Sequence, residues 1–238
     1  MDMRLDKLLA NTGFGSRKEV KQLLKKNMVM VNQTIEKDGK VHVNPENDEV
    51  FVNGEKVRYK QFVYFLLHKP QGYVSATEDV REQTVLDLLK ESDQIYNVHP
   101  VGRLDKNTEG LLLLTNDGSL THRLTSPKYK VPKTYYAHIR GTVFEKHIEA
   151  FQQGVVLDDG YQSLPATLTI LKSGDISEIE LTIVEGKFHQ VKRMFEALGM
   201  KVIYLKRLSM GPLQLDEDLT IGHYRELTEK EVKELKQD

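Results

Sequence analysis

The sequence predicts an α+β protein made of two unequal domains. The chain of 238 residues exceeds the usual size of one domain, so one large or two smaller domains are expected. Segments with helical and with strand periodicity mix without strict alternation, which favours an α+β fold over a doubly wound one. The sequence changes at Phe62 from the polar segment "GEKVRYKQ" at 54–61 to an apolar, strand-like run. The polar segment is the best linker candidate. We therefore assign the domains to residues 1–57 and 62–238.

The first domain is predicted to hold a few helical turns and a small sheet. Ser16 and Glu19 have the spacing of a capping box, which predicts a helix over 17–26. The alternating segment "MVMVN" is typical of a strand, and "VFVNGEKV" holds an Asn53-Gly54 pair between two β-prone runs. Asn-Gly in that position indicates a hairpin.

The second domain is predicted to combine long strands with helices. The strand-like segments are "FVYFLLHKPQGYV", which ends in a Lys-Pro-x-Gly loop, "KTYYAHIRG" and "SEIELTIVEG". The helical segments are "EKHIEAFQQG", the stretch from His189 to Leu198, and "LTEKEVKELKQD", which opens with a capping box from Thr228 to Glu231.

Composition excludes several function classes. The 34 basic and 35 acidic residues give a formal net charge of −1, so total charge predicts no polyanionic partner. The absence of cysteine excludes disulfides, thiolate nucleophiles and cysteine-based zinc sites. The eight histidines form no ligand-like cluster, and "TGFGSRK" lacks the third glycine of a dinucleotide fingerprint. The N-terminal stretch has no apolar core flanked by a cleavage site, and no run of about 18 apolar residues occurs, so neither secretion nor membrane spanning is expected. We expect a cytoplasmic protein with no metal, no cofactor and no membrane partner.

Positive charge is concentrated in three segments of the chain. Residues 1–30 carry seven Lys or Arg against three acidic residues. Residues 121–141 carry five basic residues, three tyrosines and no acidic residue, and residues 185–207 are also basic. Cations interleaved with aromatic rings suit a nucleic acid with unstacked bases, because phosphates need Lys or Arg and bases stack on rings. The alternative for 121–141 is a solvated strand and loop with core tyrosines.

The stretch "VGRLDKNTEGLLLLTNDG" at 101–118 places charged residues beside an apolar run. Leu111–Leu114 predict a buried strand, and residues 116–118 predict a turn. One interpretation makes Arg103 and Asp105 a surface ion pair. The other makes Asp105 a partly desolvated carboxylate held rigidly at the mouth of a core strand, as covalent or acid–base catalysis requires.

Four segments resemble the RsuA/RluB-type pseudouridine synthases. "GRLDKNTEGLLLLTNDG" resembles the signature of that family, "HKPQGYV" its first motif and "EGKFHQVKRMFEALG" its third. "RLDKLLANTGFGSRKEVKQLLKKNMVMVN" is similar to the small S-four-type RNA-binding domain that its members carry at the N-terminus. The resemblance covers nearly the whole chain. It implies an S-four-like domain followed by a synthase domain with a large mixed, mostly antiparallel sheet flanked by helices.

The resemblance implies an enzyme that isomerises a uridine in RNA to pseudouridine: the glycosidic bond breaks, the uracil rotates, and it is rejoined through carbon 5. Asp105 corresponds to the catalytic carboxylate, which acts by nucleophilic attack or by proton abstraction from the sugar; the sequence leaves both routes open. Tyr135 resembles the tyrosine that stacks on the uracil, and Lys187 stands where a basic residue pairs with the carboxylate. Arg103 resembles the arginine that fills the gap left by the flipped nucleotide. Leu205 is expected in the apolar pocket wall.

Ribosomal RNA is the implied partner. "SPKYKVPKTY" and "HQVKRMF" look closer to the members that modify 16S rRNA, so we expect a monomeric enzyme acting on 16S rRNA or on a small-subunit assembly intermediate. The alternatives are an enzyme of the same family acting on 23S rRNA and a non-catalytic rRNA-binding assembly factor. The residues expected to bind RNA, chiefly through its phosphates, are Arg4, Arg17, Lys18, Lys21, Lys25, Lys69, Arg123, Lys128, Lys130, Lys133, Lys192 and Arg193.

Overall fold

The computed structural model describes residues 2–237, which form two compact units. The first unit runs to Val63 and includes Lys90–Asn97, a segment that the sequence predicted to lie in the second domain. The second unit comprises Tyr64–Leu89 and the chain from Val98 onward. Each unit encloses its own cluster of buried hydrophobic side chains, as separate domains do.

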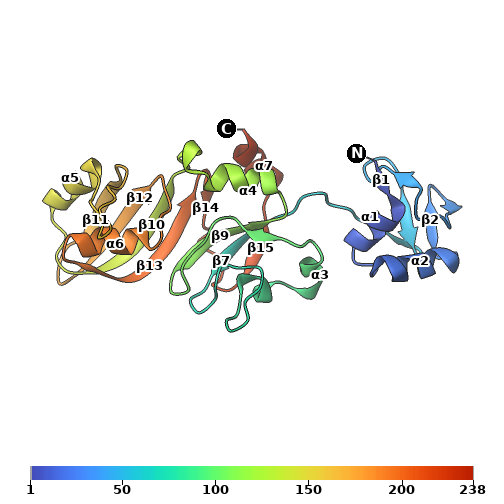
Figure 1. Ribbon diagram of the computed structural model, residues 1–238, viewed down its shortest axis with the longest axis horizontal. Helices are drawn as coiled ribbons and strands as arrows, with labels where there is room; N and C mark the ends of the chain where they lie inside the picture. The colour runs from blue at the N-terminus through green and yellow to red at the C-terminus, as the bar shows by residue number, and fades with distance from the viewer. Residues whose placement is uncertain (1, 238) are drawn as a thin grey trace. The chain divides into compact units, whose positions relative to one another are not determined.

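Short helices and strands make up the first unit (Figure 1). Its elements are β1 (Met3–Arg4), α1 (Leu5–Asn11), α2 (Arg17–Lys25), β2 (Val29–Val31), β3 (Thr34–Ile35), β4 (His42–Val43), β5 (Val50–Val52), β6 (Glu55–Lys56) and α3 (Glu91–Gln94). Four of the strands form an antiparallel sheet in the order β3-β2-β5-β6, and β1 pairs with β4.

The helix predicted behind Ser16 is confirmed as α2. Its capping box is formed, since Ser16 N–H donates to Glu19 Oε2 at 2.7 Å and Glu19 N–H donates to the Ser16 hydroxyl at 3.5 Å. Val20 and Leu24 pack into the core of the unit, whereas the lysine and arginine side chains of α2 are exposed. The helix therefore presents a basic outer face.

The predicted hairpin at Asn53-Gly54 is confirmed and joins β5 to β6. Both turn residues have positive φ angles, 52° and 82°, as a type I′ turn requires. The linker predicted at 54–61 is wrong in part, because Glu55–Lys56 form β6 and pair with β5. Both side chains of this edge strand are exposed. An exposed edge strand can be made of charged residues, so its sequence is hard to distinguish from that of a linker.

A nine-stranded sheet with helices on it makes up the second unit. Its elements are β7 (Tyr64–Lys69), η1 (Val85–Leu88), β8 (His99–Pro100), β9 (Glu109–Thr115), α4 (Gly118–Thr125), η2 (Pro127–Tyr129), β10 (Lys133–Arg140), α5 (Glu145–Gln153), β11 (Thr167–Lys172), β12 (Ile176–Ile183), α6 (Gln190–Ala197), β13 (Lys201–Met210), β14 (Leu213–Gln214), β15 (Tyr224–Glu226) and α7 (Glu229–Lys236). The strands and helices predicted here from the sequence are confirmed.

The sheet is mixed and mostly antiparallel, as expected. Its main path is β11-β12-β10-β13-β9-β7-β15, with β14 paired to β13 and β8 to β9. Only β13 and β9 run parallel among the described strand pairs. Helix α5 packs on β11 and α6 on β13 (Figure 1). Every helix of residues 2–237 is too short or too polar to span a bilayer.

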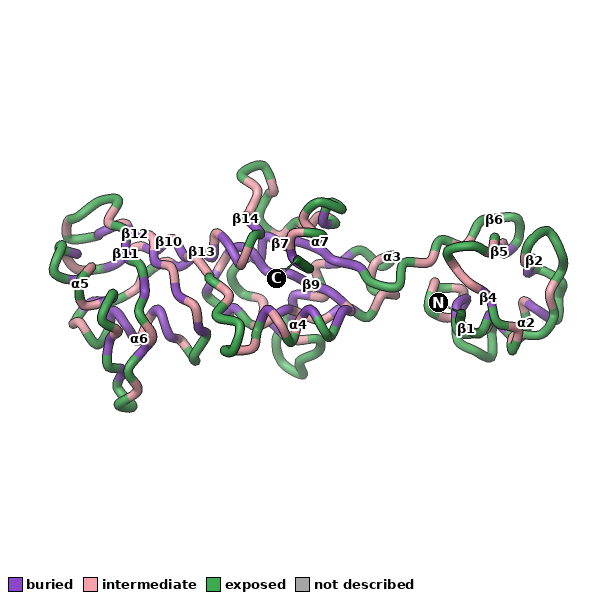
Figure 2. The backbone as a smooth tube through the Cα atoms, turned by 90° about the horizontal axis from the view of Figure 1, so that it is seen from above, coloured by how far each residue is buried: buried purple, intermediate pink, exposed green. Residues whose placement is uncertain are grey.

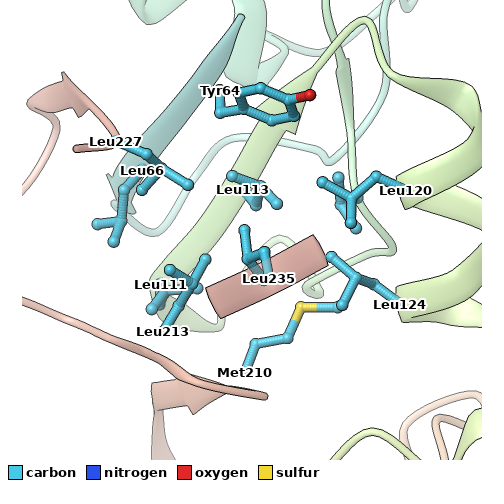
Figure 3. Close-up of a cluster of buried hydrophobic side chains, with 11 residues drawn as sticks. Tyr64, Leu66, Leu111, Leu113, Leu120, Leu124, Met210, Leu213, Leu227 and Leu235 are labelled. Atoms are coloured by element: carbon cyan, nitrogen blue, oxygen red, sulfur yellow. The ribbon is translucent and has the colours of Figure 1, made fainter. Parts of the chain in front are cut away.

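Strands β7 and β9 form the buried centre of this sheet. All of β7 is buried, and so is β9 from Gly110 to Thr115 (Figure 2). On one face, Leu66, Leu111 and Leu113 pack against leucines of α4 and α7 (Figure 3). The buried strand predicted at Leu111–Leu114 is therefore confirmed, and the two helices cover one of its faces.

Asp117 begins helix α4, where the sequence predicted a turn at residues 116–118. Its carboxylate accepts a hydrogen bond from Leu120 N–H at 3.0 Å and another from the Tyr64 hydroxyl at 2.8 Å. The following segment "GSLTHRLT" buries only Leu120 and Leu124, so its helical periodicity is too sparse to be recognised in the sequence. The cap ties the helix to the core strand β7.

Gly110 allows the parallel strands β9 and β13 to approach closely. It lies opposite Arg207 in the strand register and has a φ of +107°. A Cβ atom added there would lie 2.2 Å from the Arg207 carbonyl oxygen. Any side chain would push β9 and β13 apart.

We predict that Gly110→Ala destabilises the protein by about 3 kcal/mol, because the clash is with backbone and the φ angle is unfavourable for alanine. Chemical denaturation would measure the change. The matched control is Gly118→Ala at the start of α4, where an added Cβ has no neighbour within 4 Å and φ is not positive. That variant should be as stable as the natural protein or slightly more so. Equal stability of the two variants would contradict the close-approach argument.

Candidate active site

Asp105 lies in the loop between β8 and β9, with its side chain 27% exposed. Its Oδ2 atom accepts a hydrogen bond from Lys192 Nζ at 2.6 Å. Its Oδ1 atom is 3.5 Å from His189 Nε2. Arg103, two residues earlier, is exposed and makes no ion pair with Asp105 among the described residues. The surface ion pair considered from the sequence is therefore wrong, because the carboxylate turns toward α6.

Lys69 holds the loop that carries Asp105. Its ammonium group is fully buried and donates to the backbone carbonyls of Pro70 and Thr108, each at 2.9 Å, and of Asp105 at 3.2 Å. The loop is also bonded to Ser75, whose hydroxyl donates to the Leu104 carbonyl at 2.9 Å. The Lys-Pro-x-Gly loop and the loop of Asp105 are thereby joined into one structure.

The RNA contact predicted for Lys69 is wrong, because its ammonium group is buried and donates its hydrogen bonds to backbone carbonyl oxygens. Burial lowers the pKa of Lys69 to about 8. The negative charges of Asp105 and Glu109 act in the opposite direction and favour the ammonium form. Lys69 is thus a structural cation beneath the loop of Asp105.

The loop from Val184 to His189 brings α6 against Asp105. Glu185 is buried and accepts hydrogen bonds from the Tyr161 hydroxyl at 2.7 Å and from Leu164 N–H at 2.9 Å. Gln190, the first residue of α6, donates to the same carboxylate. His189 has a φ of +48°, which turns the chain into the helix. Lys192 then lies in the first turn of α6.

A cavity of about 840 Å³ opens beside Asp105, with Arg103, Tyr135 and Lys187 in its lining. A smaller pocket of about 80 Å³ adjoins it, lined by Asp105, Tyr135 and Leu205 among others. Tyr135 and Leu205 are buried side chains of neighbouring strands β10 and β13. The structure therefore brings together all five residues that the sequence assigned to catalysis.

The expected pairing of Lys187 with Asp105 differs from the observed one. Lys187 Nζ lies 4.5 Å from the centre of the Tyr161 ring, and Lys192 is the lysine bonded to the Asp105 carboxylate. Lys187 precedes α6 in an exposed loop, whereas Lys192 is on the helix face turned toward the loop of Asp105. The RNA contact predicted for Lys192 is accordingly replaced by an ion pair.

The other predicted RNA-binding residues are of two kinds. Several have exposed side chains and form no ion pair with any residue that the structure describes: Arg17, Lys18, Lys21 and Lys25 on α2, and Lys128 and Lys130 near η2. The rest already have protein partners: Arg4 with Asp6, Arg193 with Asp158 and Asp159, Arg123 with the Lys236 carbonyl, and Lys133 with the Val131 carbonyl. An Arg or Lys that is bonded within the protein is a weaker candidate for a phosphate contact than a free one.

Two residues of the cavity were not found from the sequence. His189 lies beside Asp105, and Arg207 on β13 lines the cavity although it is only 2% exposed. The alternation of "LKRLS" places Arg207 on the same face as Leu205, so its inward direction was present in the pattern. Within residues 2–237 there is no group of three or more His, Asp or Glu side chains that could hold a metal ion.

Comparisons with known proteins agree with this geometry. Residues 63–197 match the family model described as RNA pseudouridylate synthase, and residues 3–50 match the S4 domain. A Bacillus subtilis protein named "Uncharacterized RNA pseudouridine synthase YtzG" is 53% identical over 97% of each chain. A solved structure described as a pseudouridylate synthase is 38% identical, covers 98% of this chain and 99% of its own, and has a TM-score of 0.69.

Two further relatives are named for ribosomal substrates. The Ribosomal small subunit pseudouridine synthase A of Vibrio cholerae is 44% identical over 97% of this chain and 98% of its own. The Ribosomal large subunit pseudouridine synthase B of Bacillus subtilis is 41% identical over 98% of this chain and 95% of its own. Similarity of this extent covers both units of the structure.

We predict that Lys69→Met lowers the free energy of unfolding by about 3 kcal/mol, because several buried carbonyl groups lose their donor. The affinity of the folded variant for RNA should stay within about twofold of the natural protein, since no phosphate contact is removed. Denaturation and RNA titration would measure the two quantities. Lys106→Met in the same loop is the control for stability, because its exposed ammonium pairs with the exposed carboxylate of Glu82 and with no other described carboxylate. A large loss of affinity at unchanged stability would restore the RNA-binding role of Lys69.

Proposed function

The chain belongs to the RNA pseudouridylate synthase family, and on that premise we propose that it isomerises one uridine of 16S ribosomal RNA to pseudouridine. The observation that carries the proposal is the Asp105 carboxylate, held by Lys192 at the edge of a cavity that Tyr135 also lines, with Leu205 in the small adjoining pocket. The enzyme class follows from the family, and the choice of 16S rRNA is our own inference.

In this proposal the target uridine leaves its stack in the RNA and enters the cavity. Extrusion costs on the order of a few kcal/mol, which phosphate contacts elsewhere on the protein offset. Tyr135 offers its ring to the uracil, and exposed Arg103 at the cavity edge occupies the gap in the RNA. The apolar wall around Leu205 keeps water from the detached base while it rotates.

Asp105 is proposed as the reacting group, by attack on the sugar or by removal of a sugar proton. Both routes need a carboxylate with a fixed position. The ion pair with Lys192 fixes the side chain, and the bonds from Lys69 and Ser75 fix its backbone. A group positioned in this way reacts with little reorganisation.

The substrate proposal rests on the relatives and on two segments of the chain. The Vibrio cholerae small-subunit enzyme is similar over nearly the full length, and "SPKYKVPKTY" and "HQVKRMF" resemble the branch that modifies 16S rRNA. We further propose that the enzyme acts as a monomer in the cytoplasm, on 16S rRNA or a small-subunit assembly intermediate. The exposed cations of α2, in the S4 domain, are proposed to bind phosphates of that RNA.

We predict that cells lacking the protein lose pseudouridine at one position of 16S rRNA. The natural protein should restore the modification and Asp105→Asn should not, because the amide is neither a nucleophile nor a base of comparable strength. Nucleotide-resolution mapping of pseudouridine in 16S and 23S rRNA would measure this. Loss of a 23S position instead would contradict the substrate proposal, and restoration by the variant would contradict the role of Asp105.

Purified Asp105→Asn protein provides the matching test in vitro. Its affinity for the rRNA fragment should stay within about tenfold of the natural protein while product formation is lost, because phosphate contacts are retained. A non-catalytic assembly factor would bind the fragment without forming product even as the natural protein.

We predict that replacing Lys18, Lys21 and Lys25 together by alanine weakens RNA binding at least about tenfold. The plot of log affinity against log salt should become flatter by up to about two, since each lost single-strand phosphate contact removes about 0.7 from the slope. Fluorescence titrations at several salt concentrations would measure both. Alanine at Lys230 and Lys233, exposed cations of α7, is the control. An unchanged slope for the α2 variant would exclude these residues from the RNA interface.

A further inference from the structure

Arg207 is a buried cation in the wall of the cavity. It is 2% exposed, and its Nε atom donates to the Leu111 carbonyl at 2.8 Å. Its Nη2 atom is buried without a hydrogen-bond partner. Within residues 2–237 no carboxylate forms an ion pair with Arg207. The Asp105 carboxylate, which lines the same cavity, is bonded to Lys192 instead. A buried guanidinium donor with no acceptor is unfavourable in a folded protein unless a ligand supplies one.

A second cation lies near Arg207 in the same cavity. Lys133 of β10 lines the cavity with Arg207, and within residues 2–237 its Nζ donates only to the Val131 carbonyl, at 2.8 Å. Burial lowers the pKa of Lys133 to about 8, and the charge of Arg207 adds to this shift. Two cations that repel each other therefore share a wall of the cavity. The carboxylates in its lining, Asp105 and Glu185, are bonded to Lys192 and Gln190, and no described carboxylate pairs with either cation. Such an arrangement favours negative charge in the space between them.

Arg207 lies next to Tyr135, the residue proposed to stack on the uracil. Tyr135 and Arg207 are direct neighbours across β10 and β13, and both line the cavity with Asp105. A uracil ring that contacts Tyr135 would thus have Arg207 near its edge and Asp105 near its sugar. The two charged groups would face different parts of one nucleotide.

We propose that Arg207, with Lys133 beside it, binds the negative charge that forms on the uracil when it is detached from the ribose. This inference rests on the proposed function. It assigns to Arg207 a role that none of the residues considered so far fills, because Asp105, Tyr135 and Arg103 act on the sugar, the ring face and the RNA stack.

Both routes open to Asp105 produce this anion. If an Asp105 oxygen attacks C1′, the new C–O bond forms as the C1′–N1 bond breaks, and the electron pair stays on N1. If Asp105 removes the proton from C2′, a C1′–C2′ double bond forms and the electron pair again leaves with N1. In either route the charge is shared by O2 and O4 of the uracil. Guanidinium N–H groups are strong donors to such oxygens.

The charge is lost again when C5 of the rotated uracil bonds to C1′. In the first route this bond releases the Asp105 carboxylate, and in the second the proton on Asp105 returns to C2′. Transfer of the C5 proton to N1 completes the isomer. Arg207 therefore stabilises a species between substrate and product, whereas the bound neutral uridine gains little from it. An interaction of that kind affects kcat far more than KM.

The test compares Arg207→Met and Arg207→Lys with the natural protein on an rRNA fragment. The expected result is a kcat about a hundredfold lower for the methionine variant, the magnitude typical of losing one such donor, with KM within threefold and partial recovery by lysine. Arg225→Met is the control for stability, because Arg225 forms ion pairs with Asp216 and Glu231 away from the cavity. Its melting temperature should fall while its kcat is retained. An unchanged kcat for Arg207→Met, or a change in KM alone, would overturn the inference.

A substrate with 5-fluorouridine at the target position tests the charge itself. Fluorine withdraws electrons and stabilises the detached anion, so the loss in the rate of uracil detachment in Arg207→Met should be about tenfold smaller than with uridine under single turnover. Detachment is the step compared, because C5 of 5-fluorouracil has no proton to transfer to N1. Equal losses on both substrates would overturn the inference. Lys133→Met should show the same pattern with a smaller effect, and it carries the test if the Arg207 variants do not fold. A natural protein that leaves uridine unchanged would instead contradict the proposed function.

Discussion

The buried ammonium of Lys69 is the interaction on which the active site depends. It joins the end of β7 to the loop of Asp105 through several backbone carbonyls. A lysine in such a place is expensive to bury, and its own hydrogen bonds to carbonyl oxygens are what make it tolerable. Lys69 thereby fixes the backbone of the loop, and the hydrogen bond from Lys192 fixes the carboxylate of Asp105.

The core of the second unit supports that arrangement. β7 and β9 are buried along nearly their whole length, and α4 and α7 cover one face. Gly110 lets β13 approach β9 closely enough to place Arg207 behind the loop of Asp105. The proposed reacting group lies in the loop that precedes β9, and the proposed anion-binding group lies on β13, so their spacing depends on one missing side chain. A loop anchored to rigid strands holds its side chains more accurately than a free loop does.

Charge is distributed unevenly around the cavity. Lys69 and Lys192 are used within the protein, by carbonyls and by Asp105. Arg207 and Lys133 have no carboxylate partner among the described residues. The first pair accounts for how the carboxylate is held. The second pair is the charge available to a substrate, and its burial makes that charge more effective than it would be in water.

The sequence by itself determined the α+β class and most of the helices and strands. These features depend on local patterns, such as the capping box at Ser16, the Asn53-Gly54 turn and the apolar run from Leu111 to Leu114. The resemblance of the motif around Asp105 to a known family indicated the carboxylate that we propose as the reacting group, whereas the local pattern alone also allowed a surface ion pair.

Only the tertiary structure decided which cations serve the site. Lys69, Lys187 and Lys192 look alike in the sequence, yet one is buried under a loop, one lies over an aromatic ring and one holds Asp105. The role of each is set by distances between segments far apart in the chain. Arg207 shows the same limit, since its inward direction follows from strand alternation but the missing partner of its guanidinium is visible only in the packed structure.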